Sequence, residues 1–172
     1  MSASFTGGGV QGEGVLAEVE RALGVQFPSD YRAFIASRGG VDEFVPPAGD
    51  FLSIYAQGRL IELNAAAEAA ERFPGGVIIG GDGSREMLTY DFRQQPPPLV
   101  LLDITAEGWD AAIHQAPSFA ALMAEFPTTG WRFDGEDDAT AYDQEVWDEQ
   151  VRQHKHGHLR NERPKVRIQR LV

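Results

Sequence analysis

The chain has 172 residues, 42% of them hydrophobic, and a formal net charge of −11 at pH 7. This length and apolar content indicate one folded domain with an extension and exclude disorder throughout. The absence of cysteine excludes disulfides, thiolate metal sites and cysteine nucleophiles. No apolar stretch approaches the length of a membrane span, and the N-terminal residues lack the pattern of a signal peptide. We therefore expect a cytoplasmic protein.

The first predicted element is a helix over residues 12–23. Its apolar residues recur at spacings of three and four, which places them on one face: Leu16, Val19 and Leu23. Gly24 follows directly, and we expect it to end the helix as a left-handed C-cap.

A second helix is predicted to begin at Pro28, whose missing N–H costs nothing at the first helical position. Asp30 lies in its first turn, near the positive end of the helix dipole. Three side chains at helical spacing form its buried face: Tyr31, Phe34 and Ile35. The paired Gly39 and Gly40 end the helix.

The middle of the chain favours an antiparallel sheet. We expect a loop over residues 41–47, a strand over 51–55 and a helix over 65–73. Three further strands are predicted over residues 76–80, 86–92 and 99–103. The Asp-Gly pair within residues 81–85 is a hairpin signal, and connections this short cannot carry parallel crossovers.

The C-terminal part begins with a predicted strand over 108–114 and a helix that Ser118 caps. Asp137 or Asp138 then caps a further helix that ends at Gly157. Residues 166–171 alternate with period two, which fits either a strand at a sheet edge or a basic tail that awaits a partner. The predicted fold class is α+β, a mainly antiparallel sheet flanked by helices, with a domain over 12–127 and a charged extension over 128–172.

The order of these elements and the residues of the helix pair resemble the SUKH superfamily, over about residues 12–127. The matching positions in the helix pair are Leu23, Gly24, Phe27, Pro28, Asp30, Tyr31, Phe34, Ile35, Gly39 and Gly40. A Gly-Asp-Gly turn that contains Asp82 and Gly83 and a closing Ser-Phe-x-x-Leu helix extend the match. Arg38 departs from the pattern, because relatives often carry Asn there, and Asn tolerates left-handed geometry better.

Candidate chemical sites have simpler structural interpretations. Residues 80–84 could be a phosphate or calcium loop, but a strand follows where a phosphate site needs a helix, and calcium needs more oxygen ligands. We therefore expect a hairpin turn. The three histidines at positions 154, 156 and 158 fit an exposed basic helix end better than a metal site, because nearby arginine and lysine repel cations. His114 stands alone and is expected to be structural.

Catalytic motifs give no positive signal. The chain has no Gly-x-Ser-x-Gly elbow and no Ser-x-x-Lys motif, and runs of acidic residues usually form solvated surfaces. We expect no enzyme activity, no cofactor and no metal. The tryptophans at positions 109, 131 and 147 fit core packing better than a protein interface.

Charge is unevenly distributed. Residues 151–172 hold seven arginine and lysine side chains against one glutamate, so the preceding residues carry a net charge of −17. This acidic body makes nucleic acid an unexpected partner and favours encounter with basic proteins, unless the acidity serves only solubility.

The resemblance implies a non-enzymatic binding protein, because the superfamily contains fungal regulators of cell-wall synthesis and many bacterial immunity proteins of polymorphic toxin systems. We expect an immunity protein that binds a cognate toxin, such as a basic nuclease domain. The residues predicted to meet that partner are Asp42, Glu43, Glu136, Asp137 and Asp138. A regulatory scaffold is the first alternative, and an unrecognised hydrolase with a pocket of converging carboxylates or histidines is the second.

Overall fold

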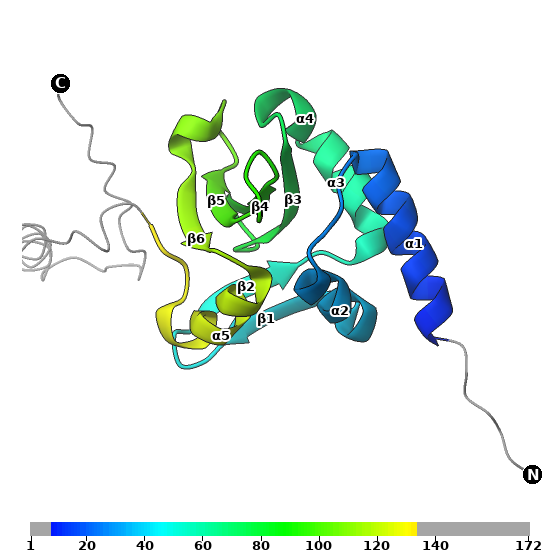
Figure 1. Cartoon of the computed structure of the whole chain (residues 1–172). Helices are drawn as coiled ribbons and strands as arrows, with labels where there is room; N and C mark the ends of the chain where they lie inside the picture. The colour runs from blue at the N-terminus through cyan, green and yellow to red at the C-terminus, as the bar shows by residue number, and fades with distance from the viewer. Residues whose placement is uncertain (1–7, 134–172) are drawn as a thin grey trace, which may run out of the picture. The chain divides into compact units, whose positions relative to one another are not determined.

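The domain is built around a sheet whose strands follow one another in sequence order. The computed structural model describes residues 8–133, with side chains from Gly14 onward. Within that range the sheet has six strands, and every neighbouring pair is antiparallel (Figure 1). The strands are β1 (Val41–Val45), β2 (Asp50–Ile54), β3 (Gly76–Gly81), β4 (Glu86–Asp91), β5 (Leu99–Asp103) and β6 (Ile113–Ala116). The predicted α+β class and antiparallel sheet are confirmed.

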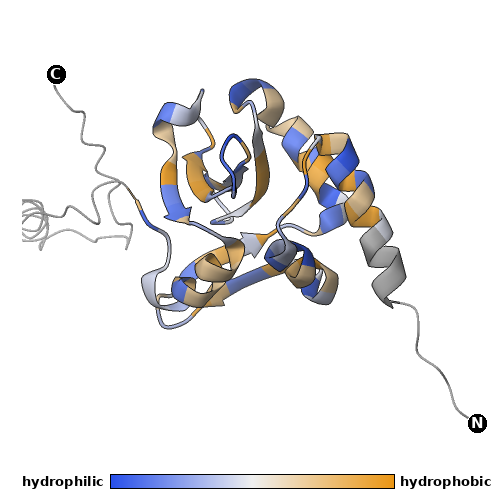
Figure 2. Ribbon diagram, in the orientation of Figure 1, coloured by the Kyte–Doolittle hydropathy of each residue, from blue (hydrophilic) through white to orange (hydrophobic). Residues whose placement is uncertain are grey.

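Five α-helices of the described residues flank this sheet. They are α1 (Gly8–Leu23), α2 (Ser29–Arg38), α3 (Leu60–Ala66), α4 (Ala69–Arg72) and α5 (Phe119–Thr129). Two 3-10 turns, η1 (Gln57–Arg59) and η2 (Trp109–Ala111), precede α3 and β6. In the coloured part of α1, from Gly14 onward, hydrophobic and hydrophilic residues are interspersed, as expected for a helix with one buried face (Figure 2).

Aromatic rings join α2 and α5 to one face of the sheet. The ring centroid of Tyr31 lies 5.7 Å from that of Tyr90 in β4 and 5.2 Å from that of Phe119 in α5. All three side chains are buried, and burying an apolar ring of this size contributes roughly 1.5–3 kcal/mol. The Tyr31 and Tyr90 hydroxyls find no hydrogen-bond partner among the described residues, which offsets part of that gain. Met87 is three residues from Tyr90 on the same strand and so points to the opposite face. There it packs in a second cluster: Ala69, Phe73, Ile78, Met87, Val100, Leu102 and Ala106.

Glycines end the first two helices as the sequence predicts. Gly24 has φ +68°, and the N–H of Val25 donates to the carbonyl of Glu20 at 3.0 Å, which closes the end of α1. Gly39 has φ +74° and caps α2. Arg38 is the last residue of α2 and has no positive φ, so the substitution of Arg for Asn leaves the turn intact. Pro28 is the N-cap residue, one position before the helical position predicted for it.

The prediction of a loop over residues 41–47 is wrong, because Val41–Val45 forms strand β1. Its residues pair with β2 from Val41 opposite Ile54 to Val45 opposite Asp50. Consecutive Asp and Glu residues have low strand propensity, and the strand has no fully buried side chain, so no alternating pattern marks it. Pairing with β2 overrides this weak local preference.

Two other predicted elements have different bounds. The helix expected over 65–73 begins at Leu60 and is interrupted at Glu68, whose φ is +53°, so it forms α3 and α4. The Arg72 guanidinium donates to the carbonyls of Ala67 and Ala106, which fixes the chain at this break. The strand expected over 108–114 is instead a 3-10 turn followed by β6 at 113–116.

Asn64 of α3 occupies the place where β2 leaves β3. Only Ser53 and Ile54 of β2 pair with β3, so Ile78 lies beyond the ladder. The Asn64 carboxamide donates to the carbonyl of Ile78 at 2.8 Å and accepts from its N–H at 2.8 Å. Asn64 is buried, and its side chain therefore satisfies the backbone groups of Ile78 that β2 does not reach.

Asp30 connects α2 to α5. Its Oδ2 accepts from the backbone N–H of Ala120 at 2.8 Å, in the first turn of α5. The predicted cap is also present, because Ser118 Oγ accepts from the N–H of Ala121 at 3.1 Å. Two free N–H groups of α5 are thus satisfied, and Asp30 has a structural role.

Candidate interaction surface

Strand β1 forms one edge of the sheet and carries exposed acidic and aromatic side chains. It pairs with β2 alone, since β1 is the terminal strand of the sheet order. Asp42, Glu43 and Phe44 are all exposed, and Phe44 keeps 71% of its surface accessible to solvent. Aromatic side chains are enriched in protein interfaces, so this exposed ring beside two acids makes β1 a candidate contact surface.

The outer edge of β1 also presents free backbone groups. The N–H of Tyr55, just after β2, donates to Ile79 of β3, and the carbonyl of Ser53 in β2 lies against Gly80 of β3. The backbone groups of these two alternate residues therefore point away from β1. The backbone groups of Ile54 and Leu52 therefore point toward β1, where Leu52 is opposite Glu43. It follows that the N–H and C=O groups of Asp42 and Phe44 point outward. Across residues 8–133 no hydrogen bond to these outward groups is found.

Asp42 and Phe44 share one face of the edge with residues of β2. Asp42 accepts a hydrogen bond from Ser53 Oγ at 2.6 Å, which fixes its carboxylate. The Phe44 ring meets the Phe51 ring edge to face, with centroids 5.0 Å apart. Gly83 packs against Phe51 so closely that an added Cβ would lie 2.6 Å from the ring. The turn between β3 and β4 therefore borders this aromatic pair.

Negative charge converges beside this face. Burial raises the pKa of Tyr55, with Arg59 opposing the shift, and the carboxylates of Asp82 and Asp42 raise it further. Both carboxylates thus act on one hydroxyl, although Asp42 belongs to β1 and Asp82 to the β3–β4 turn. We call Asp42, Glu43, Phe44, Phe51 and Asp82 the acidic edge.

The turn over residues 80–84 has the geometry of a hairpin, as predicted. Asp82 Oδ1 accepts from the N–H of Ser84 at 2.8 Å and from the N–H of Glu86 at 2.9 Å. Gly83 has φ +74°, which glycine adopts without strain. The Asp82 carboxylate is therefore engaged by the turn itself, and the strand that follows leaves no helix N-terminus for a phosphate.

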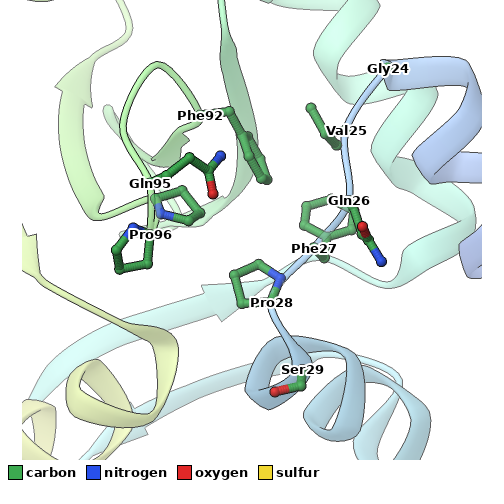
Figure 3. A pocket seen from close by; sticks show the side chains of 10 residues that line it. Gly24, Val25, Gln26, Phe27, Pro28, Ser29, Phe92, Gln95 and Pro96 are labelled. Carbon is green, nitrogen blue, oxygen red and sulfur yellow. The ribbon is translucent and has the colours of Figure 1, made fainter.

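A groove of about 570 Å³ lies between the α1–α2 loop and the β4–β5 loop. Figure 3 shows Phe92 and Pro96 of one loop facing Val25 and Pro28 of the other. The groove is lined by Gly24, Val25, Gln26, Phe27, Pro28, Ser29, Phe92, Gln95, Pro96 and Pro97. None of these residues carries a carboxylate or an imidazole. The groove offers apolar and amide contacts and holds no acid–base pair of the kind that the hydrolase alternative requires.

Asp91 holds the loop on one side of this groove. Its carboxylate accepts from Arg93 Nε at 2.8 Å and from Gln94 Nε2 at 2.9 Å. The hydrogen bond from the Arg93 side chain lowers the pKa of Asp91, and burial opposes that shift. The Arg93 guanidinium also lies 3.9 Å from the centre of the Trp109 ring. These contacts order the chain that follows β4.

The sequence-predicted residues divide into three groups. The positions that carried the family resemblance lie in the helix pair and the hairpin turn, where they cap, pack and turn the chain. Asp42 and Glu43 lie side by side in sequence on the exposed edge, on opposite faces of β1. The predictions for residues 134–172 lie outside the described residues, namely Glu136, Asp137, Asp138, Trp147, the three histidines, the helix and the final strand.

Phe44 was not predicted as a site residue, and Asp82 was predicted only as a structural residue of the hairpin turn. Phe44 was assigned to a loop, and no sequence signal distinguishes an exposed edge phenylalanine from a buried one. His114 is exposed on β6, and Trp131 is buried against Phe126 with centroids 4.7 Å apart. In the part of the chain that the structure describes, no group of acidic or histidine side chains could hold a metal. No helix there is long and apolar enough to cross a membrane.

The described residues form a small α+β domain. It has an acidic strand at one edge of its sheet and a groove lined by apolar and amide side chains. The sequence profile of the SMI1/KNR4 family (SUKH-1) matches residues 13–125. The chain belongs to this family, as its helix pair and turn predicted. The family is generally one of binding and immunity proteins. No curated protein matched the chain in a sequence comparison.

Proposed function

We propose that this protein is an immunity protein that neutralises a basic toxin, such as a nuclease domain, by direct binding. The observation that carries the proposal is the acidic edge, where Asp42 and Glu43 directly precede the exposed Phe44, in a family of binding and immunity proteins. The net charge of −11 would accelerate encounter with a basic partner, and the fixed carboxylate of Asp42 would orient it. We place the activity in the cytoplasm.

Affinity capture of the tagged full chain from lysate of its own source tests this proposal. We expect one stoichiometric basic partner that is toxic when expressed alone and harmless when co-expressed with this protein. Several weak partners without toxicity would contradict the immunity function and favour the regulatory scaffold.

A charge variant tests the edge with a matched control. The double variant Asp42→Asn and Glu43→Lys keeps an acceptor for Ser53 and changes the net charge by three. The control, Glu62→Gln and Glu71→Lys, makes the same net change on exposed positions of α3 and α4. We expect association at low salt to slow by about tenfold in the edge variant and by less than about threefold in the control. Equal slowing would show that only net charge matters.

Glu136, Asp137 and Asp138 remain predicted partner residues. Reversal of their charges is expected to slow association at low salt in the same assay. An unchanged association rate would remove these three residues from the interface.

A further inference from the structure

We propose that the acidic edge binds a basic extended segment of the partner by strand addition to β1. This inference rests on the proposed function and adds the mode of binding and the chemistry of the bound segment. The sheet order leaves β1 with one neighbour, and the outward N–H and C=O groups of Asp42 and Phe44 are the positions that an added strand would pair with.

The geometry of β1 limits the length of the added strand. Gly40, with φ +140°, precedes β1 and is packed against the backbone of Ile54 and Ala56. Pro46 follows β1 and has no N–H to donate. Pairing is therefore confined to the five residues Val41–Val45, a length of roughly 17 Å at about 3.3 Å per residue.

The side chains of the edge specify a basic and apolar sequence. Asp42 and Phe44 point to one face and Glu43 to the other, so an added strand meets a carboxylate on each face. Arginine satisfies these positions, because it pairs with carboxylates and stacks on an aromatic ring such as Phe44. An apolar side chain beside Phe44 would cover an aromatic surface that is 71% exposed.

The same charges argue against a second copy of this chain as the occupant. Two β1 strands placed edge to edge would bring Asp42 and Glu43 of one copy close to those of the other. Like charges at facing positions are destabilising, and charged edge strands resist association with their own kind. The edge therefore selects a basic extended segment and not a second copy of itself.

Amide resonances of the isotope-labelled full chain test strand addition directly. The probe is a ten-residue peptide that alternates arginine and valine, titrated into the millimolar range. We expect amide exchange to slow by about tenfold at Asp42 and Phe44, with no added protection at Glu43, whose N–H already points to β2. A peptide that alternates glutamate and valine should give no protection. Equal protection at Glu43, or no protection at any of the three, would overturn the proposal.

Two substitutions of Phe44 distinguish the contribution of its backbone N–H to peptide binding from that of its side chain. Phe44→Pro removes the outward N–H without touching the ladder to β2, and Phe44→Leu keeps the N–H with an apolar side chain. We expect the arginine–valine peptide to bind Phe44→Pro about tenfold more weakly and Phe44→Leu within about threefold of the original chain. Unchanged denaturation midpoints confirm that both variants fold. If a folded Phe44→Pro variant binds the peptide normally, strand addition is wrong.

Failure of this inference is distinguishable from failure of the proposed function. A captured toxin that is neutralised equally well by the original chain and by Phe44→Pro would leave the immunity function standing and reject strand addition. Peptide binding at Asp42 and Phe44 without any toxic partner would support strand addition and reject the immunity function.

Discussion

Within residues 8–133, backbone groups that lack a neighbouring strand are satisfied near β3 and β6 but not at the outer edge of β1. Where β2 diverges from β3, the buried Asn64 amide pairs with Ile78, and beside β6 the buried Gln115 amide accepts from the N–H of Arg132 at 3.0 Å and donates to its carbonyl at 2.8 Å. At the outer edge of β1, the described residues supply no such amide. At these two places side-chain amides satisfy backbone groups that are buried or partly buried, whereas the β1 edge is left to solvent or a partner.

The largest loss of stability is expected when the hydrogen bonds between the Asn64 amide and Ile78 are removed. Asn64→Ala leaves a buried N–H and C=O of Ile78 without partners, and we expect the free energy of unfolding to fall by about 2–4 kcal/mol. Denaturant titration measures it, with Glu62→Ala on the exposed face of α3 as the control. A loss no larger than that of the control would show that the amide pair does not hold β3.

A smaller, pH-dependent effect is expected at Asp91. The Arg93 side chain lowers the pKa of Asp91 in the folded state below its ordinary value near 3.9, so its stabilising contribution is complete above that value. The contribution is lost as pH falls through the lowered pKa of the folded state. We expect Asp91→Asn to reduce stability at neutral pH by about 1.5–3 kcal/mol, and the difference from the original chain to shrink below pH ~4. A difference that is constant with pH would contradict the role of the ionised carboxylate.

The hydrogen bonds between the Gln115 amide and Arg132 should contribute somewhat less to stability, because Gln115 lies in a strand and Arg132 does not. We expect Gln115→Ala to lower the free energy of unfolding by about 1–2 kcal/mol, since it leaves the N–H and C=O of Arg132 unpaired. Exposed His114 is the neighbouring control, and His114→Ala should change stability little. Similar losses in the two variants would contradict a specific role for the Gln115 amide.

The smallest effect on stability is expected at the acidic edge. Glu43 is exposed on β1, and Glu43→Lys should change the free energy of unfolding by no more than about 0.5 kcal/mol. The same thermal or denaturant measurement used for Asn64→Ala checks this value. A large loss would mean that the edge is part of the folded structure and not a surface kept for binding.

Local signals were sufficient to predict the helix pair and the hairpin. Gly24, Gly39 and the Asp82–Gly83 turn each require a backbone geometry that few other residues adopt easily, so position and conformation could be inferred together. Strands β3 to β5 were also predictable, because they are rich in buried apolar residues with turn residues between them.

Tertiary pairing determined what could not be predicted. Strand β1 has no fully buried side chain and depends on β2, so the exposure of Phe44 followed only from the register. The break at Glu68 depends on hydrogen bonds from Arg72 to carbonyls as distant in sequence as Ala106. Asp42 and Glu43 were predicted from charge alone, and their role at the interface stays a prediction.

Amide hydrogen exchange of the free full-length chain tests most directly whether the β1 edge is open. We predict that the amides of Asp42 and Phe44 exchange at least about tenfold faster than the amide of Glu43, because only the latter points into the sheet. Equal protection of all three amides in the free protein would show that the outer edge of β1 is already paired, and would contradict the account of this edge as a binding surface.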